Sequence, residues 1–465
     1  MRWITWLSLI MSPIALAQQP EALSKLITNY KYVSEAELRY PIDERMAFWQ
    51  IPSVSVSTFK DSKPDWQFVL GNRNEAGDVA TPDTRYQVAS ISKPVTTLIV
   101  LRAAEKGLLQ LGSNIQPLLK PKFSKLIHSP ITLTQLLSHQ AGFNHVGYMG
   151  VESDLPLPSL DSYVKSDSKY GVLKQEFAVG EFHYSNGGYI IVQHILEQVY
   201  GKPFDVIAEQ EVFEPLNMTD SSFVQPETEQ VIGEFAHAHR LGQWEKTGWH
   251  KYAAKSAAGL WTTPSDLTKL LIAVHHAYVG EDESWLTQNS VYKINYPATT
   301  FMGLGFFRND GAQTGYLFHG GINHGFESHF VFYPNQGTGA VVMTNGQKGD
   351  QLALEIIRAI SVEEEWLDYS LNQSEVLKVE LSDLKPLVGR YQYDKNFYAD
   401  VFIRNNMLYV QGYQQDAYIL HKVAENEFKP FEFQSTFRFE LSKEGKVRGL
   451  TQDAPFDTSF AEKVK

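Results

Sequence analysis

The pattern of the chain changes near residue 384, and this change constrains the fold more than any other feature. Before it, stretches with helical spacing alternate with strand-like stretches, whereas only short strand-like runs separated by turns follow it. Helical spacing and strand alternation in one region indicate a mixed α/β fold, whereas strand-like runs alone indicate an all-β fold. We therefore predict an α/β body over residues 18–375, a linker around residues 370–383, and a small antiparallel β-barrel-like domain over residues 384–465.

The body begins and ends with strand-like stretches and has helices between them. Residues 53–70 and 316–345 each contain alternating apolar runs on either side of a turn. Strands from both ends of a region with helices between them fit one discontinuous sheet flanked by helices, an α/β (α+β) class. Helical spacing is expected over four ranges: 21–40, 90–106, 188–200 and 355–369.

The chain has 465 residues, no cysteine and a net charge of -12. The missing cysteines exclude disulfides, thiolate metal sites and a cysteine nucleophile, so the core alone must hold the fold. The charge argues against a nucleic-acid partner, because no basic surplus exists to neutralise phosphates. We expect a small-molecule or peptide substrate and no cofactor, and the sequence leaves the oligomeric state open.

The first 17 residues have the pattern of a secretory signal peptide. Arg2 supplies the positive charge, residues 3–14 are mostly apolar, and Ala15 and Ala17 form a small-x-small cleavage site. No later stretch has 18 consecutive apolar residues, so we expect no membrane span in the mature chain. The sequence predicts cleavage after Ala17 and a secreted or periplasmic bacterial protein. An uncut signal anchor is the alternative.

Ser90 and Lys93 stand three residues apart at the head of a predicted helix. Residues at this spacing share one face of a helix, so the hydroxyl and the amine lie within reach of each other. A serine hydroxyl is a weak nucleophile until a base takes its proton, and a desolvated lysine is such a base. Alone, the pair is more typical of a helix cap beside a surface lysine.

Tyr184 and Asn186 precede the helix predicted over residues 188–200. A phenol acts as a base only where a nearby cation stabilises its phenolate, and Lys93 is the obvious candidate. The Asn186 amide is able to hold that lysine and to donate an N–H to a substrate carbonyl. The alternative interpretation is a plain turn before a helix.

His319, Gly320 and Gly321 lie in a predicted strand. Glycines there allow a substrate backbone to approach closely. We expect the N–H of Ile322, together with that of Ser90, to form an oxyanion hole, which is usually the largest rate contribution in acyl transfer. A purely structural histidine at the end of a strand remains the alternative for His319.

These motifs together resemble the serine β-lactamase-related hydrolases. That family comprises class C β-lactamases, D,D-carboxypeptidases, D-aminopeptidases and related esterases. Ser-x-x-Lys, Tyr-x-Asn and a His-x-Gly in the family's Lys-Thr-Gly position occur in order, and three supporting segments also match: residues 136–142, 257–263 and 325–328. The resemblance covers roughly residues 40–360. The C-terminal domain resembles the lipocalin-like appendage of some members, on residues 387–391.

The resemblance implies a transpeptidase-like fold and an acyl-enzyme at Ser90, with Lys93 and Tyr184 sharing proton transfer. One departure matters: His319 and Gly320 replace a lysine and a threonine that bind a substrate carboxylate in penicillin-binding relatives. We therefore expect a peptidase, amidase or esterase directed at D-amino-acid substrates. A D,D-carboxypeptidase or β-lactamase is the first alternative, and a catalytically silent sensor or binding protein is the second.

Other histidines invite different interpretations. The pairs 237/239, 275/276 and 324/329 lack a recognised metal-ligand spacing, so the sequence predicts no metal site. His139 is expected to be a structural residue near the site rather than a base.

Overall fold

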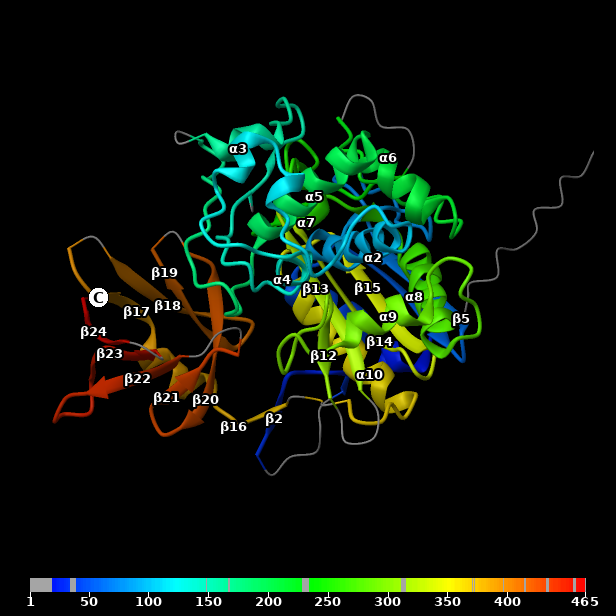
Figure 1. Ribbon diagram of the computed structural model, residues 1–465. Helices are drawn as coiled ribbons and strands as arrows, with labels where there is room; N and C mark the ends of the chain where they lie inside the picture. Colours follow the sequence, from blue (N-terminus) through cyan, green and yellow to red (C-terminus); the bar gives the residue numbers. More distant parts are fainter. Residues whose placement is uncertain are drawn as a thin grey trace, which may run out of the picture.

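The computed structural model describes these residues: 19–33, 39–147, 149–165, 168–227, 234–310, 315–369, 371, 373–395, 397–413, 415–431, 435–454 and 457–464 (Figure 1). The predicted signal peptide, residues 1–17, lies outside them. Within the described part of the chain, none of the helices combines the length and apolarity needed to cross a membrane.

A six-stranded antiparallel sheet forms the centre of the body, in the order β12-β13-β14-β15-β4-β5. Its strands come from both ends of the body, as predicted: β4 (Ser53–Lys60), β5 (Lys63–Gly71), β12 (Phe307–Asn309), β13 (Tyr316–Asn323), β14 (Phe326–Tyr333) and β15 (Thr338–Thr344). The register pairs Val342 of β15 with Val56 of β4. The two halves of the chain are therefore joined in the middle of the sheet.

Both faces of the sheet are buried, which explains why β15 reads as a continuous apolar run. Successive side chains of a strand point to opposite faces. Ala340 and Val342 belong to one hydrophobic core, with α1 (Ile42–Trp49) and α10 (Gly349–Glu363). Val341 and Met343 belong to a second core on the other face.

The second core is shared with α8 (Pro264–Val279) and with a helical lobe that Figure 1 shows above the sheet. The remaining helices on this side are α2 (Ser92–Glu105), α3 (Pro121–Ser124), α4 (Leu133–Leu137), α5 (Asn186–Tyr200), α6 (Phe204–Ala208), α7 (Lys255–Ala258) and α9 (Gln288–Asn295). Helix α2 is buried along almost its whole length, so it forms the axis of this lobe.

The C-terminal strands form a closed antiparallel barrel in sequential order. They are β17 (Gly389–Gln392), β18 (Tyr398–Arg404), β19 (Met407–Gly412), β20 (Ala417–Ala424), β21 (Glu427–Lys429), β22 (Thr436–Leu441), β23 (Val447–Ala454) and β24 (Asp457–Lys463). Pairing of β17 with β24 closes the barrel. The predicted fold class, a helix-flanked antiparallel sheet with a helical lobe followed by a β-barrel, is confirmed.

The barrel packs against the body through the outer face of two strands. On β19, Leu408 and Val410 point into the barrel core, whereas Tyr409 joins the core on the α10 side of the sheet. Ile419 of β20 joins the same core. This alternation makes the contact between barrel and body an apolar interface.

Three local predictions need correction. The helix expected over residues 21–40 is wrong: this segment forms a 3-10 turn (Glu21–Ser24) and short strands β1 (Leu26–Ile27), β2 (Tyr30–Tyr32) and β3 (Arg39–Tyr40). The helix expected over 355–369 begins earlier, at Gly349. The linker contains β16 (Ser374–Val376), which pairs in parallel with β2. Contacts between distant segments, which local spacing does not encode, decide the first and third of these.

Candidate active site

Ser90 lies in a single 3-10 turn (Ala89–Ile91) that leads directly into α2. The residue before it, Ala89, has a φ of 47°, a left-handed conformation that costs energy for a residue with a Cβ atom. Ser92 holds the turn in place, since its hydroxyl donates to the Ala89 carbonyl at 2.6 Å and accepts the Leu260 N–H at 3.0 Å. The strained turn leaves Ser90 partly exposed at the head of a buried helix.

Lys93 is completely buried one turn further along α2. Its Nζ lies 3.0 Å from Ser90 Oγ, 2.8 Å from Asn186 Oδ1 and 2.9 Å from the Ala257 carbonyl oxygen. Burial lowers the pKa of the Lys93 amine well below its usual value of 10.5. Burial therefore favours the uncharged amine over the ammonium form.

A neutral amine has two N–H donors and one lone pair. The Asn186 and Ala257 oxygens only accept hydrogen bonds, so they take the two N–H groups. The lone pair is then left for the third neighbour, the hydroxyl of Ser90. This arrangement orients Lys93 to receive the serine proton.

The Tyr184 phenol hydrogen-bonds the Ser90 side chain. Lys93 Nζ lies 4.9 Å from the centre of the tyrosine ring. Burial raises the pKa of Tyr184, an effect only partly offset by the bond to Ser90. The phenol therefore stays protonated, so the amine is the member of the pair with a lone pair free to accept a proton.

Asn186 is positioned by the first turn of α5. Ser185 caps this helix, because its hydroxyl accepts the Gly188 N–H at 3.1 Å. The cap fixes Asn186 as the first helical residue, with its amide oxygen on Lys93. The same cap places Tyr184 immediately before the helix, which explains the spacing of the Tyr-x-Asn motif.

His319 is buried on β13 with its ring centre 6.4 Å from that of Tyr184. Burial lowers the pKa of His319 to about 3, so the ring is neutral. Its Nδ1 lies 2.6 Å from the Gly320 carbonyl oxygen and therefore carries the proton. The Nε2 lone pair is buried and has no hydrogen-bond partner among the described residues.

The glycines of the motif lie where a side chain would collide with other groups of the site. A Cβ atom on Gly321 would stand 2.1 Å from the Val88 carbonyl oxygen and 3.0 Å from the Ser90 nitrogen. One on Gly320 would stand 3.1 Å from His329 Nδ1. Strand β13 therefore runs directly against the backbone of the Ser90 turn, and Ile322 follows as an exposed residue of the same strand.

The structure thus gathers all eight residues that the sequence singled out. Ser90, Lys93, Tyr184 and Asn186 are in contact through their side chains, His319 lies beside Tyr184, and Gly321 touches the Ser90 turn. The profile of the Beta-lactamase family matches residues 42–363. The chain belongs to the Beta-lactamase family.

Individual relatives are distant. The chain is 24% identical over 341 residues to "Protein flp" of Staphylococcus aureus (strain NCTC 8325 / PS 47), which is 67% of this chain and 63% of that protein. The match thus spans less than two thirds of the relative's length.

Two solved structures share the fold. The octameric penicillin-binding protein homologue from Pyrococcus abyssi superposes with a TM-score of 0.59 at 21% identity, covering 90% of this chain and 98% of that one. The D-amino acid amidase from Ochrobactrum anthropi SV3 superposes with a TM-score of 0.55 at 18% identity, covering 70% and 97%. At these identities, the similarity to the two solved structures establishes the fold of this member of the Beta-lactamase family and nothing further.

Sequence reasoning missed part of the surroundings of Tyr184. His139 lies 4.4 Å from it, ring centre to ring centre, and its Nδ1 accepts the Ser185 N–H at 3.1 Å. His145 lies 5.9 Å from the same ring, and burial lowers its pKa to about 4. His139 fits the structural role predicted for it. Nothing in the sequence marked His145, nor the Ala257 carbonyl, since backbone acceptors carry no side-chain pattern.

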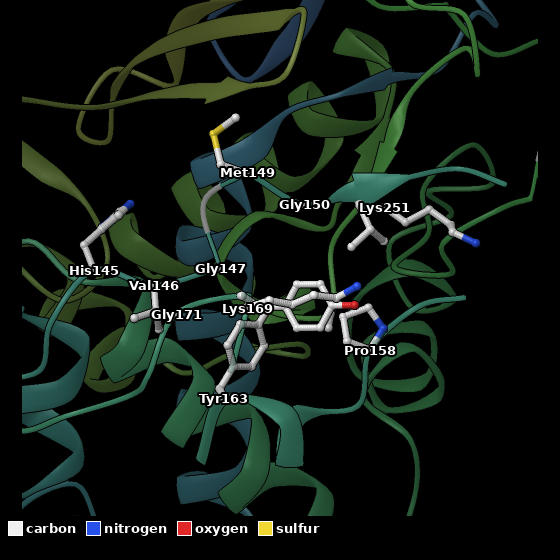
Figure 2. Close-up of a pocket in the computed structure, with 13 residues that line it drawn as sticks. His145, Val146, Gly147, Met149, Gly150, Pro158, Tyr163, Lys169, Gly171 and Lys251 are labelled. Carbon is white, nitrogen blue, oxygen red and sulfur yellow. The ribbon is translucent and has the colours of Figure 1, made fainter. Parts of the chain in front are cut away.

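Two cavities adjoin the site. The first, of about 320 Å³, begins at His145 and extends between Tyr163, Pro158 and Lys169 (Figure 2). The second, of about 390 Å³, begins at Ile322 and reaches the barrel at Asp416 and Tyr418. Met149 lines both cavities, so it marks the rim between them. Ser90 itself is not among the described residues that line either cavity.

Proposed function

We propose that this protein is a serine hydrolase that cleaves amide, peptide or ester bonds through an acyl-enzyme at Ser90. The observation that carries the proposal is the fully buried Lys93, whose Nζ lies 3.0 Å from Ser90 Oγ. Its two N–H groups are taken by fixed carbonyl acceptors. A lysine held in this way serves as a base rather than as a charge.

In the proposed acylation step, Ser90 Oγ forms a bond to the substrate carbonyl carbon while its proton passes to the Lys93 nitrogen. The resulting oxyanion accepts hydrogen bonds from the N–H groups of Ser90 and Ile322. The protonated phenol of Tyr184 then gives its proton to the leaving nitrogen or oxygen as the carbonyl re-forms, and Lys93 returns a proton to Tyr184. Water repeats the sequence in deacylation, which releases the acid and restores Ser90.

The substrate class that fits best is a D-aminoacyl amide, peptide or ester. His319 offers a buried acceptor lone pair where penicillin-binding relatives carry a lysine ammonium. An acceptor suits a substrate N–H or ammonium group and does not bind a carboxylate. The D-amino acid amidase with a similar fold supports this choice. A D,D-carboxypeptidase or β-lactamase activity requires a carboxylate-binding cation and is the weaker candidate.

We further propose that the protein acts outside the cytoplasm, because residues 1–17 have the pattern of a signal peptide. The same proposal divides the chain into a hydrolase domain over residues 18–375 and a barrel domain over residues 384–465. Export is testable by the mass of the mature N-terminus, which is expected to begin at Gln18.

The decisive experiment is active-site labelling. The purified protein is treated with a fluorophosphonate or a labelled penicillin, digested, and analysed for mass added to the peptide that contains Ser90. We expect a fluorophosphonate adduct in the wild type and none in Ser90→Ala. The matched control is Ser328→Ala, because Ser328 is paired with Gly321 across the sheet and its buried hydroxyl has no partner among the described residues.

A wild-type protein that stays unlabelled under conditions that label a control hydrolase would favour the silent sensor or binding protein and refute the enzyme. A panel of D-aminoacyl amides, D-alanyl peptides and short-chain esters then ranks the substrates. Turnover of penicillin faster than all of these would refute the substrate class while leaving the acyl-enzyme intact.

A further inference from the structure

A cluster of three potential metal ligands lies near the end of β13, outside the catalytic group. Glu245, His250 and His324 each offer a ligand atom, and these atoms all lie within 4.8 Å of one another. Glu245 follows β9 (Gln243–Trp244), His250 belongs to β10 (His250–Lys251), and His324 stands in the turn between β13 and β14. Three separate segments converge, which no local sequence spacing predicts.

The His250 ring is held in the tautomer that a metal ligand needs. Its Nδ1 lies 2.8 Å from the Met149 carbonyl oxygen, so Nδ1 carries the proton and Nε2 carries the lone pair. A backbone carbonyl on the non-ligating ring nitrogen is the usual support of a metal-binding histidine. The hydrogen bond thus fixes both the orientation and the protonation of His250.

The side chains of His324 and Glu245 meet at a point where a cation can bind. Nε2 of His324 lies 2.8 Å from Glu245 Oε2, and the His324 ring stacks on that of His250 with centres 3.9 Å apart. The hydrogen bond directs Nε2 and Oε2 toward each other, and a metal ion that binds both atoms displaces the ring proton from Nε2.

The backbone around the cluster is fixed from several sides. The His324 N–H donates to the Tyr252 hydroxyl at 3.0 Å, and Asn323 donates to Gln87 Oε1 and to the Ala258 carbonyl, both at 3.0 Å. Strand β10 is paired with β7 (Val151–Glu152). Only side-chain adjustment is then needed for binding, and the chief movement is a tilt of the two stacked rings so that their lone pairs converge.

We propose that Glu245, His250 and His324 form a binding site for a divalent transition-metal ion, with Zn²⁺ the best match, at the rim of the catalytic cleft. Two imidazoles and one carboxylate are a common zinc donor set and leave a fourth position for water. The ion takes the place of the N–H donor between His324 and Glu245, and the ring proton moves to Nδ1 of His324. No redox change is involved.

An ion bound at this site connects two segments that lie beside the cavities. His324 is two residues beyond Ile322, and the carbonyl that orients His250 belongs to Met149, which lines both cavities. A bound ion therefore ties the β13–β14 turn to the rim between the cavities. The inference does not depend on Ser90 acting as a nucleophile.

A second cluster in the described part of the chain, His275, His276 and Glu281, provides a matched control. There the His275 Nδ1 lies 2.7 Å from the Pro334 carbonyl oxygen, and its ring packs against Gly337, where a Cβ atom would stand 2.8 Å from Nε2. The His275 ring is therefore buried and closely packed against the Gly337 backbone. The two clusters have the same composition and differ in access.

The test uses tag-free full-length protein stripped with a chelator and dialysed against Zn²⁺ or Co²⁺. We expect one retained Zn²⁺ per chain by elemental analysis and Co²⁺ absorption bands of four-coordinate intensity; the absence of cysteine excludes thiolate bands. His250→Ala, and separately His324→Gln, should weaken retention at least tenfold, with circular dichroism verifying the fold. His276→Ala should leave it unchanged.

Failure of the wild type to retain the ion would overturn the proposal. So would retention that survives both His250→Ala and His324→Gln, or retention that is lost in His276→Ala, since either result places the ion elsewhere. Labelling of Ser90 in the stripped protein separates this outcome from a failure of the hydrolase proposal.

Discussion

Replacing Asn186 by aspartate tests the state of Lys93 with a minimal change of shape. The Asn186 Oδ1 atom accepts a hydrogen bond from Lys93 Nζ at 2.8 Å. In Asn186→Asp an ionised carboxylate stands at that distance and favours the ammonium form of the lysine. The structure predicts that this variant converts the base into a paired cation, which then cannot take the Ser90 proton.

The size of the effect follows from Coulomb's law. A unit charge 2.8 Å from another contributes about 1.5 kcal/mol in water and about 6 kcal/mol at an effective dielectric constant near 20. At about 1.4 kcal/mol per pKa unit, the pKa of Lys93 should rise by roughly one to four units. Activity at pH 7 should fall at least tenfold and recover in part as the pH is raised.

The assay is the pH dependence of kcat/KM with a short-chain ester, because this parameter reports ionisations of the free enzyme. The basic form of Lys93 is required, so the acidic limb of the profile should move to higher pH in Asn186→Asp. Asn186→Leu serves as the control: it removes the acceptor without adding charge, and its limb should not move upward. A folded Asn186→Asp protein whose acidic limb coincides with that of the wild type would refute the assignment of Lys93 as the base.

Three further predictions address the surroundings of the site. Gly321→Ala should lower kcat/KM at least tenfold, because the new Cβ meets the Val88 carbonyl at 2.1 Å, whereas Gly112→Ala, which meets nothing within 4 Å, should be silent in the same assay. Burial raises the pKa of Glu327 from 4.5 to about 7. The protonated carboxyl therefore contributes its full stabilisation below pH 4.5, and this contribution is lost as the pH rises through 7. In urea unfolding between pH 5 and 8, Glu327→Gln should lose less stability than the wild type, by up to about 3 kcal/mol. Tyr409→Ala should cost about 3 kcal/mol at the barrel interface, so the barrel and the body of this variant should unfold in two separate calorimetric transitions where those of the wild type coincide; transitions that stay coincident would mean that the barrel contact does not depend on this residue.

The catalytic group could be predicted from the sequence because its chemistry restricts residue type and spacing. Ser90 and Lys93 share a helix face, and Tyr184 and Asn186 straddle a helix cap, so each pair is local. The order of these motifs along the chain resembles that of the serine β-lactamase-related hydrolases, and this resemblance predicted that the two pairs act together. The position of His319 beside Tyr184 and its tautomer, which depends on the Gly320 carbonyl, were not predictable from the sequence.

Features that depend on distant contacts were beyond the sequence. The short strands β1, β2 and β3 form because Leu26 pairs with Tyr40, and Tyr30 with Ser374. The charge and apolar pattern of that segment does not indicate which distant residues it pairs with. The metal-ligand cluster was missed for the same reason, since its three residues meet only after β9, β10 and the β13–β14 turn have been assembled.

Burial of the Lys93 amine should favour activity and lower the free energy of unfolding, because it disfavours the protonated form that lysine has in the unfolded chain. The pKa of this lysine is depressed in the folded protein, so between that value and 10.5 the unfolded chain binds one more proton than the native state. Stability must then rise with pH across this window, by about 1.4 kcal/mol per pH unit. Lys93→Met keeps the bulk and removes the titration, although it leaves the Asn186 and Ala257 oxygens without their donor.

Between the depressed pKa of Lys93 and 10.5 the wild type should therefore gain stability relative to Lys93→Met as the pH rises, as measured by chemical denaturation, while the variant has no measurable turnover. Ser328→Ala provides the matched control, with a pH slope equal to that of the wild type. Equal slopes in the wild type and Lys93→Met would mean that Lys93 keeps its proton in the folded state. The lone pair assigned to Ser90 would then not exist, and a different base would be required.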